Sequence, residues 1–105
     1  MRIRKDKQNL STDAELIARV SDALAHPLRV DIFKYIYKEN LERRSPCTKE
    51  LVEKFGYSQS TISQHMNKFT ISGLIEVQKK NSFSYYFVNI GILGKYMDAV
   101  KKLNQ

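Results

Sequence analysis

The stretch Tyr57–Leu74, YSQSTISQHMNKFTISGL, has the features of one short helix with defined ends. Ser58 is a favourable N-cap, because its hydroxyl oxygen can accept a hydrogen bond from a backbone N–H two or three residues later. Ile62, Met66 and Phe69 then recur at helical spacing and predict a single apolar stripe. The sequence therefore predicts a capped, amphipathic helix that buries one side.

The opposite face of this helix is polar, includes Asn67 and carries no carboxylate. A solvated helix face commonly mixes Glu with Lys, whereas hydroxyl and amide groups can read base edges in a DNA groove. The pattern therefore favours contact with DNA. The predicted DNA-binding residues on this helix are Gln59, Ser60, Thr61, Ser63, Gln64 and Lys68.

Glycines predict the ends of this helix and of the helix before it. Gly73 can take the left-handed conformation that follows a helix, and Leu74 can close back onto Phe69 as in a Schellman motif. Gly56 ends a shorter helix that starts at Ser45–Pro46 or at Thr48. Only two residues separate Gly56 from the next helix, and such a tight Gly-containing turn predicts a helix-turn-helix.

After Gly73 the apolar pattern changes from helical to alternating. Leu74–Lys79 alternates and Phe83–Val88 is rich in aromatic and β-branched residues, with a polar turn between them. This pattern predicts a β-hairpin. A basic hairpin directly after a helix-turn-helix is typical of the wing of a winged helix, which can touch phosphates or a minor groove. The predicted DNA-binding residues of the wing are Lys79, Lys80 and Asn81.

Three further helices complete the predicted fold. Thr12–Glu15 is a capping box that starts the first helix. Pro27 opens the second helix, with His26 as its cap. The last helix begins at Asn89, and no apolar segment follows to cover its apolar residues, so it packs on the domain or meets a copy of itself. The predicted fold class is mainly α with a small β-hairpin, a winged helix-turn-helix of order α-α-α-α-β-β-α.

Composition favours a single soluble domain with a polyanionic partner. The 105 residues carry a formal net charge of +7, with a pI near 9.6. Between Lys54 and Met97 the only acid is Glu76. The single Cys47 excludes an internal disulfide and fits a reducing cytoplasm. We expect no membrane span and no secretory signal, because no long apolar run occurs.

Catalytic patterns are missing from the sequence. It contains no Gly-rich phosphate loop, no paired carboxylates in a pocket-like setting and no nucleophile with a base nearby. We therefore expect no enzyme activity and no cofactor.

Several segments resemble the ArsR/SmtB family of winged-helix repressors. Ala25–Phe33, AHPLRVDIF, is similar to the family's A-D-P-x-R-x-x-I-L segment. Ser58–Met66 resembles its S-Q-x-x-I-S-x-H-L recognition helix, and Ser72–Ile75 its S-G-L-V exit. Tyr85–Tyr86 sits where the second strand of the wing carries a similar aromatic pair. The similarity covers residues 14–103.

The resemblance implies a homodimer, built on the first and last helices, that binds a palindromic operator and represses transcription. Two-fold symmetry would place the two reading helices one DNA turn apart, about 34–36 Å. The expected organisation is a flexible basic tail over residues 1–10 and a DNA-binding and dimerisation domain over residues 11–105. The implied dimer-interface residues are Leu16, Val20, Leu93, Tyr96, Met97 and Val100.

The sensing chemistry of the family does not carry over to this chain. The resemblance implies a Cys-x-Cys metal site near the third helix in some members, but here Lys49 stands where the second Cys of that pair would be, two residues after Cys47. Other members use Asp, His and Glu on the last helix, which here offers Asp98 and no His. The sequence therefore predicts no metal site, and the effector, a small molecule or a metal, is unknown. Alternative functions are a protein–protein or RNA interaction module, or a metal- or redox-sensing repressor with an atypical site.

Overall fold

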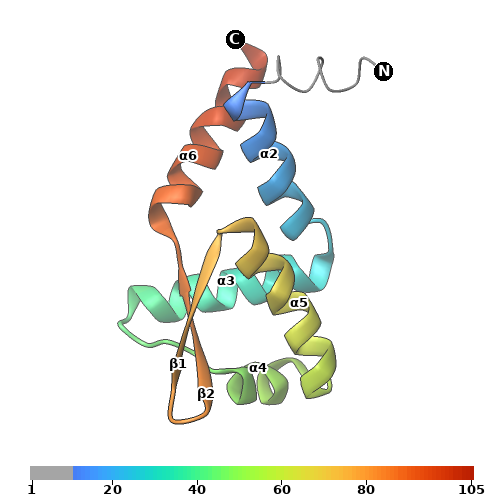
Figure 1. Ribbon diagram of the computed structural model, residues 1–105, viewed down its shortest axis with the longest axis vertical. Coiled ribbons are helices and arrows are strands. Elements are labelled where there is room, and N and C mark those ends of the chain that lie inside the picture. Colours follow the sequence, from blue (N-terminus) through green and yellow to red (C-terminus); the bar gives the residue numbers. More distant parts are fainter. Residues whose placement is uncertain (1–10) are drawn as a thin grey trace.

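The computed structural model describes residues 11–105, so the predicted basic tail of residues 1–10 lies outside the described part of the chain. The described residues form a winged helix-turn-helix, and the predicted order α-α-α-α-β-β-α is confirmed (Figure 1). The elements are α2 (Thr12–Ala23), α3 (Pro27–Leu41), α4 (Thr48–Phe55), α5 (Gln59–Ser72), β1 (Ile75–Lys80), β2 (Phe83–Val88), α6 (Ile90–Lys101) and a terminal 3-10 turn η1 (Lys102–Asn104).

Side-chain caps explain where the helices begin. Ser58 accepts a hydrogen bond from a backbone N–H of α5 at 3.2 Å, and the Nδ1 atom of His26 accepts one from α3 at 3.1 Å. Asn89 caps α6 in the same way at 3.0 Å. The prediction that Thr12 caps the first helix was wrong by one residue. Ser11 has the extended backbone that an N-cap needs, and its hydroxyl accepts from α2 at 3.0 Å.

The end of α5 differs from the predicted Schellman closure. Gly73 does take the left-handed conformation, with φ of 83°. However, the backbone N–H of Leu74 donates to the hydroxyl of Ser72 at 3.0 Å, and that hydroxyl donates to the carbonyl of Phe69 at 2.7 Å. The buried serine side chain therefore satisfies the backbone groups that a Schellman bond would otherwise pair.

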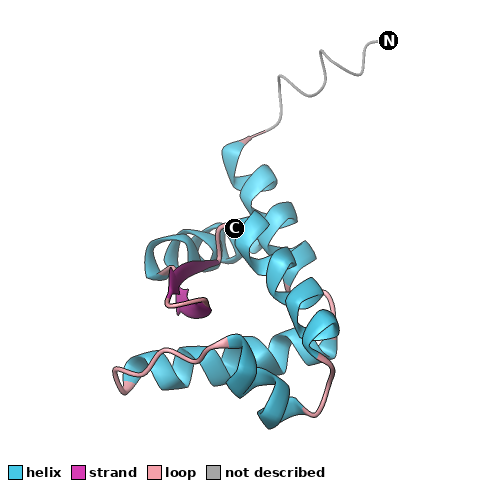
Figure 2. Cartoon of the chain, turned by 60° about the horizontal axis from the view of Figure 1, so that its bottom comes forward, coloured by secondary structure: helices cyan, strands magenta, loops and turns pink. Residues whose placement is uncertain are grey.

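The hairpin has a tight two-residue turn. Strands β1 and β2 pair antiparallel over their full lengths, with Lys80 opposite Phe83 beside the turn. Asn81 and Ser82 have φ of 52° and 71°, and a type I′ turn requires positive φ at both positions. The backbone therefore fixes the shape of the hairpin tip. Figure 2 shows these two strands as the only strand structure among the helices of the described chain.

The molecule has a narrow arm above a wider body, with overall dimensions of 46 × 30 × 25 Å. Helices α2 and α6 run side by side in the arm, and α3, α4, α5 and the hairpin form the body (Figure 1). Ser21 and Tyr96 join the two arm helices through a 3.0 Å hydrogen bond between their hydroxyl groups. No helix of the described residues has the length and apolarity needed to cross a membrane. The largest fully buried core side chains include Val20, Ile32, Ile36, Leu51, Ile62, Met66, Phe69, Leu74 and Ile75.

Asn40 ties α3 to the hairpin. Its residue type suggests the end of a helix, but α3 continues to Leu41. Its amide oxygen accepts from the backbone N–H of Val88 at 2.8 Å, and its amide nitrogen donates to the carbonyl oxygen of Arg44 at 2.9 Å. The same nitrogen lies 3.3 Å from the carbonyl oxygen of Tyr86. One amide therefore positions the second strand of the hairpin against the body.

Candidate nucleic-acid interface

The start of α5, helix α4 and the hairpin tip lie at the same end of the molecule, opposite the arm (Figure 1). Gly56 follows α4 with φ of 76°, and its left-handed backbone turns the chain sharply into α5. The predicted helix-turn-helix is therefore confirmed. The two helices pack on each other and α5 also packs on α2 and β1, so α5 is held firmly with its free face outward.

The two faces of α5 are as different as the sequence predicts. Ile62, Met66 and Phe69 are at most 2% exposed and form the inner stripe. The outer face is in contact with solvent, and α5 contains no Asp or Glu. Hydroxyl and amide groups on that face can donate to and accept from base edges. The exposed side chains on the outer face include Gln59, Ser60, Ser63, Gln64 and Asn67.

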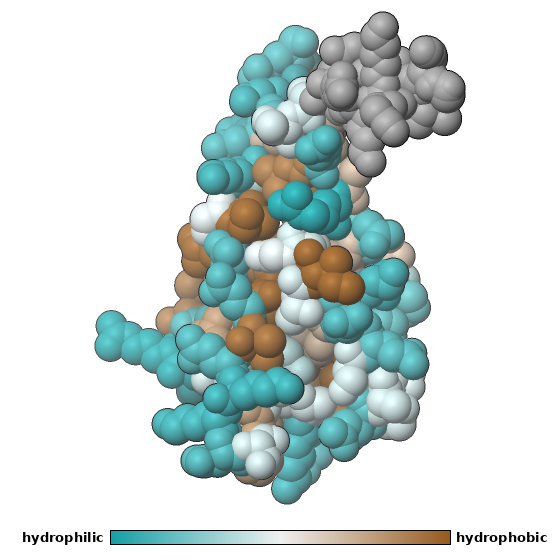
Figure 3. Space-filling model, in the orientation of Figure 1, coloured by the Kyte–Doolittle hydropathy of each residue, from teal (hydrophilic) through white to brown (hydrophobic). Residues whose placement is uncertain are grey.

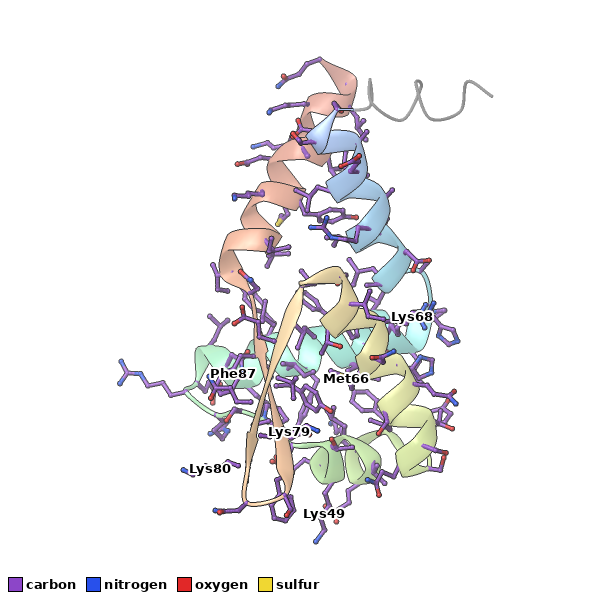
Figure 4. All side chains as sticks on the ribbon, in the orientation of Figure 1. Lys49, Met66, Lys68, Lys79, Lys80 and Phe87 are labelled. Carbon is purple, nitrogen blue, oxygen red and sulfur yellow. The ribbon has the colours of Figure 1, made fainter. Side chains whose placement is uncertain are left out.

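Two of the predicted contacts on α5 lie apart from this group. Thr61 is half-buried, and its hydroxyl accepts from Ser58 within the helix cap at 3.0 Å. Lys68 lies at the far end of α5, away from the hairpin tip, with its Nζ atom 4.0 Å from a carboxylate oxygen of Asp22 on α2 (Figure 4). The structure therefore places Lys68 against the arm. Sequence spacing could not show this, because the ion pair depends on how α2 crosses α5.

The basic residues of the wing are exposed as a group. Lys79, Lys80 and Asn81 occupy the end of β1 and the turn. Because successive side chains of a strand point to opposite faces, the two lysines extend to opposite sides of the hairpin (Figure 4). The wing therefore offers positive charge on both of its faces.

A hollow between α4, α5 and the hairpin tip contains residues that the sequence did not indicate. We refer to it as the tip hollow. Lys49, near the start of α4, lies beside the hairpin tip in Figure 4. The hydroxyl of Thr48 bonds to the hydroxyl of Tyr86 at 2.9 Å and fixes the wing to α4. The residues that line the tip hollow are Thr48, Lys49, Val52, Gln59, Ser82, Phe83 and Ser84.

His65 links α5 to the end of α2 through Arg29. The guanidinium of Arg29 donates from Nη1 to Nδ1 of His65 at 3.0 Å, and from Nε to the carbonyl oxygen of Ala23 at 2.7 Å. An arginine can only donate, so Nδ1 accepts and the imidazole is neutral. Partial burial lowers the pKa of His65, and the positive charge of Arg29 and the neighbouring His26 ring lower it further. The two imidazole rings lie 5.0 Å apart.

Acidification is expected to destabilise the fold through His65. Because the pKa of His65 is lowered in the folded chain, the unfolded chain binds a proton below pH about 6.5 that the folded chain resists. The free energy of unfolding should therefore fall as the pH decreases from about 6.5, and His65 adds no pH dependence above that range. Denaturant unfolding one pH unit above and one below this value measures the effect. His65→Gln should remove part of the dependence. An equal pH dependence in wild type and His65→Gln would contradict this assignment.

The arm carries the residues implied for a dimer interface. Val20 is 0% exposed and lies in the core of the monomer, so its side chain cannot contact a partner. Leu16, Leu93 and Tyr96 are half-buried and pack on the same core. Met97 and Val100 are exposed by 57% and 38%. Figure 3 shows hydrophobic surface along the arm between hydrophilic side chains.

Cys47 is the N-cap residue of α4. It is buried before α4, and its backbone N–H donates to a carboxylate oxygen of Glu50 at 3.2 Å. Within residues 11–105, no three side chains of His, Cys, Asp or Glu lie close enough to hold a metal ion.

Comparisons with known proteins show similarity to helix-turn-helix proteins. A family model described as a helix-turn-helix domain matches residues 24–78, slightly more than half of the chain. The nodulation protein NolR of Rhizobium meliloti is 29% identical over 91 residues, which cover 87% of this chain and 70% of NolR. The crystal structure of NolR from Sinorhizobium fredii is 26% identical with a TM-score of 0.65, over 90% of this chain and 93% of that one.

A solution structure from Mycobacterium bovis has the same fold. It is described as a homodimeric winged helix-turn-helix DNA-binding domain of a possible ArsR-family transcriptional regulator. It is 18% identical with a TM-score of 0.65, and the match covers 90% of this chain and 88% of that one.

Proposed function

The chain belongs to the helix-turn-helix domain family and is a transcriptional regulator of the ArsR type. We propose that it represses transcription by binding a palindromic operator as a homodimer. In this proposal α5 enters the major groove of duplex DNA and the hairpin contacts the phosphates or minor groove beside it.

The observation that carries the proposal is the outer face of α5. It is exposed, polar and free of carboxylates, and the tip of the wing lies at the same end of the molecule as the start of α5 (Figure 1). Amide and hydroxyl groups such as those of Gln64 and Ser63 match the donors and acceptors of base edges. Acidic side chains are common on surfaces that bind other proteins, but they would repel the phosphates of DNA. The absence of acids therefore favours DNA over a protein partner.

A two-fold dimer is supported by the exposed apolar side of α6. Ile90 is 59% exposed, Met97 is 57% exposed, and Val100 follows on the same side of the helix. The Mycobacterium bovis domain of the same fold is homodimeric. We therefore assign the exposed side of α6 to a two-fold contact that presents both α5 helices to one face of the DNA.

The proposed function predicts salt-sensitive, symmetric binding to duplex DNA. Genomic fragments selected by the protein should share a palindrome with half-sites one helical turn apart. The affinity should fall steeply with salt concentration, because each phosphate contact releases counterions. Adding about five base pairs between the half-sites, half a turn, should weaken binding strongly because the second α5 then faces the wrong side. A titration of labelled duplexes at several salt concentrations measures both effects.

Two outcomes would contradict this function. If the protein shows no salt-sensitive affinity for duplex DNA at low ionic strength, the polar face of α5 would be a protein-docking surface. Tighter binding to RNA than to the selected duplex would instead indicate an RNA-binding module.

A further inference from the structure

The tip hollow lies between helix α4, the start of α5 and the tip of the wing. Gln59, at the start of α5, and Ser82, in the turn of the hairpin, both line it. In the proposed complex, the DNA strand between the major groove at α5 and the minor groove at the wing would pass between these two residues. The hollow would then lie where that strand crosses the protein.

Hydrogen-bond donors dominate the polar part of the hollow. Lys49 supplies an ammonium group, and Ser82 and Ser84 supply hydroxyl groups. No carboxylate lines the hollow. The nearest acid in the sequence, Glu50, is turned back to the helix start, where its carboxylate accepts from the backbone N–H of Cys47. This set of donors suits a phosphate group.

One wall of the hollow is aromatic. Phe83 is a large apolar side chain at the polar end of the hairpin, and it is 47% exposed. Its ring packs against the ring of Tyr85, with the two ring centroids 6.3 Å apart. The positive φ angles of Asn81 and Ser82 fix the tip that carries it. An apolar surface beside a phosphate-binding group matches a nucleotide backbone, in which apolar deoxyribose alternates with phosphate.

We propose, resting on the proposed function, that the tip hollow seats one strand of the operator backbone. Lys49 binds a phosphate of that strand together with the serine hydroxyls, and Phe83 packs on the adjacent deoxyribose. The contact positions the protein on DNA and carries no base information of its own. It sets the register between α5 in the major groove and the wing in the minor groove.

The test compares Lys49→Gln with Lys34→Gln in the 105-residue chain on the selected duplex. Lys34 is exposed on α3 and gives the same loss of charge away from the hollow. A dimer that loses one phosphate contact in each half-site should show a slope of log affinity against log salt that is smaller by about 2, since each contact contributes about 0.9. Lys34→Gln should keep the wild-type slope. Ethylation of one phosphate in each half-site should weaken the wild type and leave Lys49→Gln unaffected.

Phe83 is tested with Phe83→Ala and Phe83→Leu. We expect Phe83→Ala to lower the affinity about tenfold at every salt concentration without changing the slope, and Phe83→Leu to restore most of it. Thermal unfolding of both variants checks that the hairpin is intact.

The outcomes separate this inference from the proposed function. If wild type binds the duplex and Lys49→Gln keeps its slope, or Lys34→Gln changes the slope equally, the hollow is not the phosphate seat, although DNA binding stands. The same is true if Phe83→Ala binds as wild type does. If wild type shows no salt-sensitive duplex binding, the proposed function fails with the inference. A slope change on an RNA duplex that is not seen on DNA would show that the strand is RNA.

Discussion

Replacing Ser63 and Gln64 together by glutamate should abolish operator binding and leave the fold intact. Both side chains are exposed on the outer face of α5, and neither lies among the buried residues of the core. A glutamate at either position removes donors that base edges need and brings a negative charge toward the phosphates. Four contacts are lost in the dimer at about 1 kcal/mol or more each, which corresponds to at least about a thousandfold weaker affinity. A titration of the labelled operator duplex measures the loss.

The control for this double variant is Asn104→Glu with Gln105→Glu. It changes the net charge of the chain by the same amount at exposed positions of the C-terminal end, far from α5. If the control weakens binding as strongly as Ser63→Glu with Gln64→Glu, the effect is one of overall charge. Unchanged affinity of the α5 variant, with normal unfolding, would show that another surface reads the DNA.

Local signals were sufficient to predict the element order and which side of α5 is exposed and polar. A capping side chain and a periodic apolar stripe act within one or two turns of a helix, so the inward side of α5 follows from Ile62, Met66 and Phe69 alone. The hairpin follows equally from its alternation and its polar turn. Local signals gave the wrong prediction at the cap of α2 and at the end of α5. At both positions a serine hydroxyl hydrogen-bonds to backbone groups in place of the predicted partner.

Contacts between distant elements were beyond the reach of the sequence. The ion pair of Lys68 with Asp22 and the complete burial of Val20 depend on how α2 lies across α5 and the core. The tip hollow likewise brings together Lys49, Gln59 and Phe83, which lie on three elements. Periodicity shows which side of an element is buried, but not which neighbour covers it. The phosphate contacts of a winged helix depend on that second kind of information.

Helix α5 is attached to the arm at several points, which favours a fixed orientation of its outer face relative to the arm. Arg19 on α2 donates from Nε to the carbonyl oxygen of Ser72 at 2.9 Å, at the end of α5. Near the middle of α5, His65 is joined through Arg29 to the end of α2. A dimer built on the arm would therefore hold its two α5 helices at a set distance, which is what a palindrome with fixed spacing requires.

Replacing Met97 by glutamate should convert the proposed dimer into monomers. Met97 is exposed on the apolar side of α6, so the monomer accepts the new charge at the surface. In a two-fold contact the same substitution occurs on both copies, and each carboxylate would be buried without a partner. At about 2 kcal/mol or more for each copy, the dimer dissociation constant should rise at least about a thousandfold. Sedimentation at several protein concentrations measures this shift.

Ile71→Glu is the matched control, because Ile71 is also apolar and 70% exposed but lies on α5, outside the arm. It changes charge and polarity equally and should leave the dimer undisturbed, as should the conservative Met97→Leu. The monomers of Met97→Glu should keep the fold and bind a single half-site with the weak affinity of one α5, losing the gain from simultaneous contact at both half-sites. If Met97→Glu sediments as a dimer with wild-type concentration dependence, the two-fold contact is not on this side of α6. If Ile71→Glu dissociates the dimer equally, α5 takes part in it, and two α5 helices in contact could not read half-sites one turn apart.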